Sequence, residues 1–198
     1  NFLKLCKIKY YNNCLFFNVQ KDFAVQTGDP TNTGTGGESL DGKLYGEQAK
    51  YFDDEIRDDL KHVNAGTVSM ANMGPNMNAS QFFITTRAGL DYLDGKHTIF
   101  GEVAEGLDIL MLINNAYVDP KFRPYRNIRI KHTVILDDPF DDPKLLEEPP
   151  ESPPPQRDGD RPEADDFDED EEGKTEFEKQ REKEARDAKS RAVVLEMI

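Results

Sequence analysis

The sequence lacks tryptophan and contains only two cysteines, Cys6 and Cys14, among its 198 residues. Two cysteines do not make a metal-ligand set, and small secreted domains held together by disulfides carry many more of them. Reduced thiols and an intracellular location are therefore expected. Neither a metal ion nor another cofactor is predicted.

Long hydrophobic runs are also missing from the sequence. Lys4, Lys7 and Lys9 interrupt the only apolar stretch near its start, so no segment approaches the length that spans a bilayer. Neither a signal peptide nor a membrane anchor is predicted, and no membrane partner is expected.

An excess of positive charge is absent as well. Residues 1–136 hold 15 Lys and Arg against 16 Asp and Glu, whereas residues 137–198 hold 10 against 23, so the net charge of −14 belongs mainly to the second part. A near-neutral body and an acidic tail provide no basic surface that would attract nucleic-acid phosphates. Direct RNA binding by these residues is not predicted.

Composition divides the chain into three parts. Residues 1–136 are predicted to form one compact domain, as the length allows. Residues 137–173 are rich in proline and acidic residues, which favour extended, unpacked backbone, so a disordered acidic linker is expected there. Residues 174–198 repeat Glu and Lys or Arg at i,i+4 spacing without Gly or Pro, which predicts a charged helix.

Short stretches rich in β-forming residues follow one another through the first part. The apolar residues of segment 2–8 fall on one stripe, which predicts a helix, and residues 106–115 predict a second helix. The other runs are bounded by Gly, Pro or Asn at a spacing typical of an all-β barrel or sandwich. Strands are predicted at residues 15–19, 23–26, 66–71, 81–86, 97–103 and 128–136.

Apolar residues in these runs could line a small pocket, with Phe23, Phe83 and Leu93 as its walls. Proline is an apolar ring without an N–H group, so a site that recognises it needs shape and apolar walls. Polar neighbours would hold the peptide carbonyl groups, and the candidates are Gln26, Asn72 and His97. Plainer roles stay open, because amides in loops commonly satisfy buried backbone groups and a lone histidine or phenylalanine is typical of a core.

Several motifs, in a fixed order, resemble the cyclophilin family. They are FFNVQKDFAVQTGD at residues 16–29, TGTGGES at 33–39, SMANMGPNMNASQFFITT at 69–86 and LDGKHTIFGEV at 93–103. The resemblance covers residues 16–136 and implies a mainly β fold, a cyclophilin-like antiparallel β-barrel with two flanking helices. It also implies peptidyl-prolyl cis–trans isomerase activity, the acceleration of rotation about X-Pro peptide bonds.

The resemblance places the start of the chain inside the first helix of the family. The first two strands of the family would then lie before Asn1. The barrel is therefore expected to be incomplete at its N-terminal side, because a barrel escapes exposed strand edges only by closing.

Position by position, the resemblance implies contacts with the substrate at eight residues. These are Phe23, Gln26, Ala71, Asn72, Gln81, Phe83, Leu93 and His97. The catalytic positions that it implies are Asn18, Phe23, Gln26 and His97.

Three residues depart from the pattern of the family. Asn18 stands where active cyclophilins carry an arginine, Ala24 replaces a methionine, and Tyr92 replaces a tryptophan; the last two belong to the substrate-binding surface. An asparagine amide is shorter than arginine and delivers no positive charge. Two functions are therefore left open, an isomerase and a non-catalytic module or scaffold that binds proline peptides.

The tail narrows the resemblance to one branch of the family. DDPFDDPKLLEEPP at residues 137–150 and VVLEMI at residues 193–198 resemble nuclear cyclophilins, of the peptidyl-prolyl isomerase-like type, that carry an RNA-recognition motif further along the chain. The branch implies proline segments of RNA-processing or transcription proteins as partners. Nuclear location is expected from this resemblance alone, since no basic import cluster is present, and the cytoplasm is the alternative.

The stacking aromatics of an RNA-recognition motif do not occur in this sequence. RNA contact is therefore expected only through a downstream domain that is absent from this chain. A monomer is expected.

Overall fold

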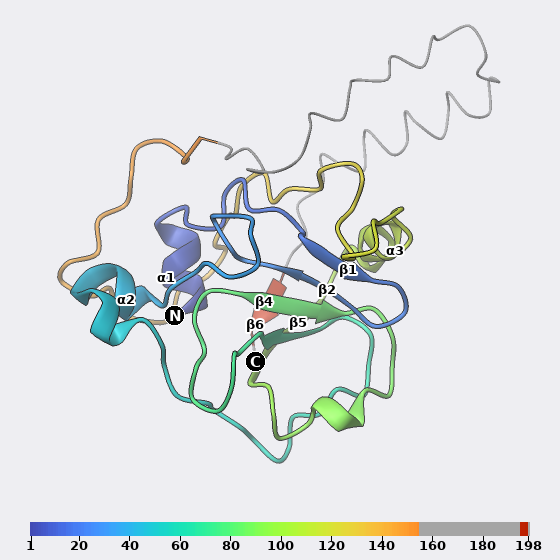
Figure 1. Cartoon of the computed structure of the whole chain (residues 1–198). Helices are drawn as coiled ribbons and strands as arrows, with labels where there is room; N and C mark the ends of the chain where they lie inside the picture. Colours follow the sequence, from blue (N-terminus) through green and yellow to red (C-terminus); the bar gives the residue numbers. More distant parts are fainter. Residues whose placement is uncertain (155–194, 198) are drawn as a thin grey trace, which may run out of the picture.

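The structure, a computed structural model, describes residues 1–154 and the backbone of residues 195–197 (Figure 1). Six strands form one antiparallel sheet in the linear order β1-β2-β4-β3-β5-β6. The strands are β1 (Asn18–Gln20), β2 (Ala24–Thr27), β3 (Thr67–Met70), β4 (Phe82–Thr85), β5 (Ile99–Val103) and β6 (Leu195–Met197). The helices are α1 (Phe2–Lys7), α2 (Leu40–Tyr45) and α3 (Leu107–Asn114), with 3₁₀ turns η1 (Glu47–Ala49) and η2 (Asp91–Leu93).

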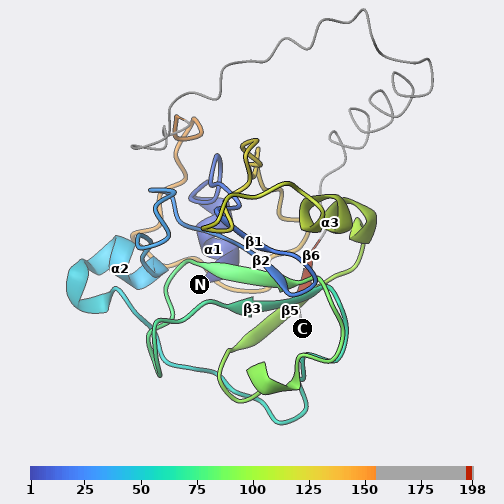
Figure 2. The same cartoon turned by 45° about the vertical axis from the view of Figure 1, so that its right-hand side comes forward.

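These elements confirm the predicted mainly β, antiparallel fold and the two helices predicted at residues 2–8 and 106–115. In the described part of the chain, no helix is long and apolar enough to cross a membrane. Helix α1 lies against one face of the sheet, and the turn η2 lies beyond the other face (Figures 1 and 2).

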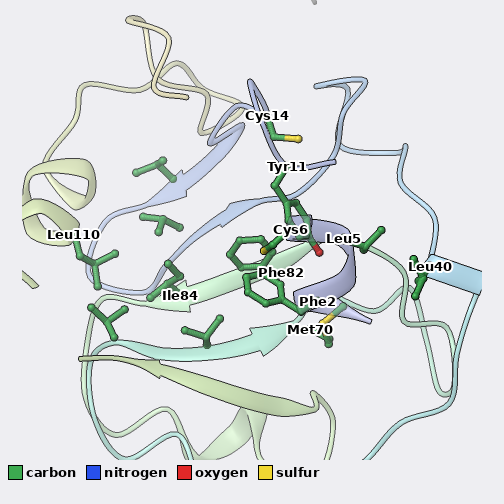
Figure 3. Packing of buried hydrophobic residues seen from close by; sticks show 14 residues of the cluster. Phe2, Leu5, Cys6, Tyr11, Cys14, Leu40, Met70, Phe82, Ile84 and Leu110 are labelled. Atoms are coloured by element: carbon green, nitrogen blue, oxygen red, sulfur yellow. The ribbon is translucent and has the colours of Figure 1, made fainter. Parts of the chain in front are cut away.

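Strands β2 and β4 each contribute to two hydrophobic clusters, because successive residues of a strand point to opposite faces of the sheet. In β4, Phe82 and Ile84 belong to the larger cluster and Phe83 to the smaller one. Helix α1 packs on the larger cluster, where the rings of Phe2 and Phe82 meet edge to face with their centroids 5.2 Å apart (Figure 3). The face that carries Phe83 is therefore left to the smaller cluster and to the predicted site.

The turn after α1 connects this helix to the edge of the predicted site. Phe2, Leu5 and Cys6 form the buried stripe of the helix, as the apolar spacing predicts. Tyr11 follows the helix and is fully buried, and its hydroxyl donates to the backbone oxygen of Ser80 at 3.0 Å. Ser80 directly precedes Gln81, so α1 and its turn support the backbone that presents a predicted site residue.

Helix α2 has no counterpart among the predicted elements. The Ser39 side chain caps it by accepting the Gly42 N–H at 2.9 Å, and Gly46 ends it with a positive φ of 97°. Leu40 and Leu44 stand one helical turn apart, but the helix has only six residues and includes a central glycine, which lowers helix propensity. The capping serine and this leucine pair were the signals for the helix in the sequence.

The strand predicted at residues 128–136 is wrong for most of its length. Only an isolated bridge pairs Leu15 with Arg129 there. Further along, the Thr133 N–H donates to the side-chain oxygen of Asn12 at 3.2 Å instead of to a neighbouring strand. Residues 128–130 share backbone hydrogen bonds with residues 13–16 in the turn after α1, and the pairing does not continue to Thr133, whose N–H is taken by the Asn12 side chain.

The charged helix predicted at residues 174–198 is wrong for residues 195–197. These three residues form β6, which pairs with β5 so that Met197 lies opposite Gly101. The outer edge of β5 offers unpaired backbone groups that an extended segment can take up. The other residues of the predicted helix, 174–194 and 198, lie outside the described residues, as do residues 155–173 of the predicted linker.

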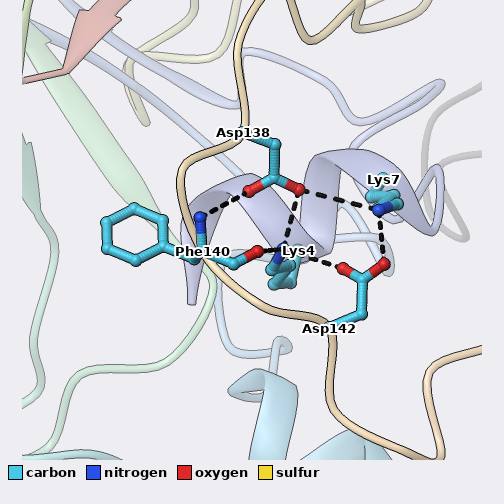
Figure 4. Close-up of polar contacts among 5 residues, drawn as sticks. All are labelled: Lys4, Lys7, Asp138, Phe140 and Asp142. Atoms are coloured by element: carbon cyan, nitrogen blue, oxygen red, sulfur yellow. Dashed lines mark hydrogen bonds and ion pairs between the residues drawn. The ribbon is translucent and has the colours of Figure 1, made fainter.

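Residues 137–154, predicted as the start of the linker, lie against α1; we call this segment the C-terminal strap. The ammonium group of Lys4 lies 2.7 Å from a carboxylate oxygen of Asp138 and 2.7 Å from one of Asp142 (Figure 4). It also donates to the backbone oxygen of Phe140. Lys4 is only 5% exposed, so these strap residues satisfy a buried charge of the domain.

Contacts of the strap continue toward residue 153. Lys9 donates to the backbone oxygen of Pro149 at 2.7 Å, and the Asn12 side chain donates to the Ser152 hydroxyl at 2.9 Å. The contacts with the domain therefore extend past residue 136, where the sequence places the domain boundary.

Candidate functional site

Four neighbouring strands place one residue each in a row across the sheet. Asn18 of β1 lies opposite Gln26 of β2, and Gln26 lies opposite Phe83 of β4. Phe83 in turn lies opposite Ser69 of β3. Directly opposite residues of antiparallel strands point to the same face. The row therefore brings three predicted site residues together and adds Ser69, which the sequence did not single out.

Side-chain amides along this row form a chain of hydrogen bonds. Asn18 Nδ2 donates to Gln26 Oε1 at 3.0 Å, and Gln26 Nε2 donates to Gln81 Oε1 at 2.9 Å. Gln81 Nε2 then donates to the backbone oxygens of Gly34 at 3.1 Å and Gly36 at 2.7 Å. All three amides donate in the same direction, so each one fixes the orientation of the next. Gln81 also satisfies backbone groups, the plainer role considered for it above.

The loop that supplies these two backbone oxygens is folded around Asp29. Its fully buried carboxylate accepts the N–H groups of Thr31 at 2.8 Å, Gly34 at 2.7 Å and Gly36 at 3.0 Å. A Cβ atom on Gly36 would collide with this carboxylate, so the close approach requires glycine. Asp29 therefore sets the loop geometry on which the amide chain ends, although no sequence pattern marked it.

An apolar cluster lies beside the amide chain. Its buried members are Ala24, Phe83, Leu90 and Leu93, with Phe23 and Ala71 partly buried against them. Tyr92 lies at the rim, 51% exposed, and its ring stacks on that of Phe23 with 6.2 Å between the centroids. The apolar residues predicted to contact a proline ring therefore lie together.

His97 closes the cluster on the side of β3. Its Nδ1 lies 3.0 Å from the backbone oxygen of Met70, and its ring meets that of Phe83 edge to face at 5.2 Å. A carbonyl oxygen only accepts, so Nδ1 carries the proton and Nε2 is the acceptor of the neutral ring. Burial lowers the pKa of His97 below its ordinary value, which favours this neutral form.

Asn72 is held by two acceptors on other loops. Its Nδ2 lies 3.2 Å from the Asp54 carboxylate and 2.8 Å from the backbone oxygen of Lys96. The carboxylate also accepts the N–H of Asn76 and the side chain of Asn78, each at 2.8 Å. Burial favours the protonated acid, but these hydrogen bonds outweigh it and lower the pKa of Asp54. Asp54, which the sequence did not predict, thus orders the loop that carries Asn72.

The remaining contacts join the predicted residues into one surface. The Ala71 N–H donates to the backbone oxygen of Gln81 at 3.0 Å. Lys96, whose backbone oxygen holds Asn72, directly precedes His97. No group of three or more His, Cys, Asp or Glu side chains is placed to hold a metal among the described residues. The roles of the individual side chains stay predictions.

Comparison with known proteins identifies the family of the chain. The model of the family described as cyclophilin type peptidyl-prolyl cis-trans isomerase/CLD matches residues 1–135. The chain belongs to the cyclophilin family.

Two curated proteins show how closely this cyclophilin resembles its relatives. It is 70% identical to peptidyl-prolyl cis-trans isomerase CYP59 of Arabidopsis thaliana over 148 residues, which cover 75% of this chain and 29% of that protein. It is 56% identical to human peptidyl-prolyl cis-trans isomerase-like 4 over 201 residues, which cover 100% of this chain and 41% of that protein. The chain thus spans less than half the length of these relatives.

Solved structures agree with the family assignment. A cyclophilin type peptidyl-prolyl cis-trans isomerase of Cryptosporidium parvum is 42% identical to this cyclophilin with a TM-score of 0.63, over 70% of this chain and 83% of that chain. A second crystal structure of that protein, obtained in the presence of the dipeptide Ala-Pro, is 41% identical with the same TM-score, over 70% of this chain and 84% of that chain.

Proposed function

We propose that this cyclophilin domain catalyses the cis–trans isomerisation of X-Pro peptide bonds. The observation that carries the proposal is the row formed by Asn18, Gln26 and Phe83, in which amide donors stand directly beside an apolar ring. His97 lies edge-on to the same ring. A proline ring on the apolar cluster would thus have donors within reach of its flanking peptide groups.

The reaction is a rotation, with no bond made or broken. Its barrier is roughly 18–20 kcal/mol because resonance flattens the amide, so a catalyst must bind the twisted amide more tightly than either planar form. Twisting returns a lone pair to the proline nitrogen, which can then accept a hydrogen bond. Asn18 Nδ2 carries two N–H groups, of which Gln26 Oε1 takes one. The second is the donor that we assign to the twisted nitrogen.

Asparagine makes this donor weaker than a guanidinium would be, since an amide brings no charge. Preorganised donors still favour the twisted form, because the amide chain fixes them before the peptide arrives. The rate is therefore expected to be lower than with arginine at position 18. A non-catalytic proline-binding module is the alternative, and it is favoured by the uncharged side chain of Asn18.

The substrate class follows from likeness to relatives. The Cryptosporidium parvum cyclophilin was crystallised in the presence of Ala-Pro, which supports a proposal that Ala-Pro segments of proteins bind the apolar cluster here. We further propose that the natural substrates are proline segments of nuclear RNA-processing or transcription proteins. This part of the proposal depends on the resemblance of the tail alone.

Exchange NMR on an Ala-Pro-containing peptide tests the activity. The 198-residue chain should accelerate cis–trans exchange, and Gln26→Leu should reduce the acceleration by removing both amide contacts of residue 26. Lys43→Ala, an exposed change on α2, is the control and should behave like the parent. Peptide shifts without exchange would favour the non-catalytic module, and the absence of both would contradict either function.

A further inference from the structure

His62 is a fully buried histidine that lies behind the proposed site. It is 1% exposed, and its two ring nitrogens are both engaged. Nδ1 lies 2.7 Å from Asp94 Oδ1, and Nε2 lies 2.8 Å from the hydroxyl of Ser69. The His62 N–H also donates to Asp94 Oδ1 at 2.9 Å. This histidine therefore links β3 to the turn that carries Leu93 and Asp94.

The hydrogen bonds fix the proton positions on the ring. Burial is the largest single influence on Asp94 and by itself would raise its pKa. The hydrogen bonds from the backbone and ring of His62 together outweigh burial, so the pKa of this carboxyl is lowered. An ionised carboxylate only accepts, so Nδ1 of His62 carries the proton. In the neutral imidazole Nε2 is then an acceptor, to which the Ser69 hydroxyl donates. Both ring nitrogens therefore have a hydrogen-bond partner.

The order Ser69, His62 and Asp94 resembles the triad of a hydrolase, but the surroundings exclude that chemistry. Ser69 has no exposed surface, so no substrate carbonyl reaches its hydroxyl, and a nucleophile must be accessible to act. The arrangement is therefore a support for neighbouring groups.

The group that His62 supports is Phe83. The imidazole lies nearly parallel to the phenyl ring, with centroids 6.1 Å apart and 13° between the planes. Ser69, the second partner of His62, lies opposite Phe83 in the sheet. The backbone oxygen of His62 accepts the N–H of Leu90, another member of the apolar cluster, at 3.0 Å. One buried residue thus contacts the wall of the proposed site and the turn beside it.

We propose that His62 is a positioning residue of this site, which holds Phe83 and the turn at residues 90–94 in the arrangement that binds the twisted X-Pro amide. The proposal rests on the proposed isomerase function, because its effect is exerted on that site. Mispositioning of a binding surface by a fraction of an ångström lowers rate and affinity without removing any contacting group.

Two substitutions separate the hydrogen bonds of His62 from its stacking. His62→Phe keeps an aromatic ring against Phe83 and loses both polar contacts, whereas His62→Gln can donate to Asp94 and accept from Ser69. We expect His62→Phe to lower the exchange rate or peptide affinity of the full chain about tenfold. We expect His62→Gln to recover most of the loss, an outcome that a purely space-filling role would not produce.

A core substitution on the other face controls for general destabilisation. Val103→Ala at the end of β5 truncates a buried side chain of the larger cluster, and it should lower the thermal midpoint without changing exchange in molecules that remain folded. His62→Phe with parental exchange and affinity would overturn this proposal alone. A parent chain that neither binds nor isomerises the peptide would overturn the proposed function as well, so the two failures are distinguishable.

Discussion

Asn18 lies directly opposite Gln26 in the sheet and donates a hydrogen bond to its side-chain oxygen at 3.0 Å. The position at which the resemblance implies an arginine is thus occupied by a residue that is built into the amide chain of the site. Gln20 Nε2 also donates to Asn18 Oδ1 at 3.2 Å. Asn18 is therefore preorganised, and what it lacks is positive charge.

Asn18→Arg should raise the rate of X-Pro exchange about tenfold, because a charged donor stabilises a developing lone pair more than an amide does. The measurement is exchange NMR at saturating peptide. Asn18→Lys is the comparison, since it adds charge without the planar fork of arginine and should gain less. Equal rates for parent and Asn18→Arg would show that residue 18 does not contact the reacting amide.

Gln81→Met should weaken peptide binding about tenfold, equivalent to about 1.4 kcal/mol. Gln26 Nε2 would lose its acceptor, and the oxygens of Gly34 and Gly36 would lose their donor. A peptide titration followed by NMR or calorimetry measures the change. Gln48→Met on η1 is the matched control and should bind like the parent, because Gln48 is exposed. Parental affinity for folded Gln81→Met would leave Gln81 with only its backbone-satisfying role.

Residues of the site that lie in strands could be predicted from the sequence, because alternation fixes their face. Phe83 stands between Phe82 and Ile84, which enter the larger cluster, so it must point the other way. The residues that support the site could not be predicted in this way. Asp29 and His62 act through hydrogen bonds whose partners are set only by the folded chain, and neither residue belongs to an apolar period.

The ends of the chain show a second limit of sequence patterns. Residues 128–136 alternate like a strand, but their backbone pairs with residues 13–16 only around residues 128–130, and further along the Asn12 side chain takes the Thr133 N–H. Charge spacing predicts a helix through residues 195–197, yet the edge of β5 makes these residues extended. Local preference is overruled in both places by what lies beside the segment.

His97 should titrate below its ordinary pKa of about 6.5, because burial disfavours the imidazolium. As pH falls below about 6.5, His97 is protonated in the unfolded chain before it is protonated in the folded one, so the folded state loses stability from that pH downward. A pH series of ring ¹H–¹⁵N spectra measures the midpoint. Peptide affinity should be constant from about pH 8 to 6.5 and fall once His97 is protonated. A midpoint above 6.5 would contradict this account.

Removing Lys4 should cost less stability than removing its two carboxylate partners in the strap. Lys4→Met removes a buried charge, keeps the apolar stem and leaves two carboxylates that water can reach, so its effect on stability should be small. The double change Asp138→Asn with Asp142→Asn leaves the Lys4 ammonium without a carboxylate partner. A charge that has lost its partner is destabilising, so the double variant should unfold at a lower temperature and a lower urea concentration than Lys4→Met. Thermal and urea denaturation of the full chain compare the two, with the exposed change Lys43→Met as control.

The same ion pairs predict how this difference depends on pH. Hydrogen bonds from Lys4 lower the pKa of both Asp138 and Asp142. The stability that the two carboxylates contribute is therefore present above the pKa of an unfolded aspartate, about 3.9, and is lost as pH falls through their folded pKa values. Burial opposes the charge of Lys4, but the two carboxylates outweigh burial and raise the pKa of Lys4. The stabilisation by the ion pairs is therefore lost at alkaline pH only as pH approaches that raised value. The stability difference between the parent and the double variant should therefore be level from about pH 5 to 9 and shrink below about pH 4. A difference that persists in acid would mean that the strap is held by its packing and backbone contacts, and not by charge.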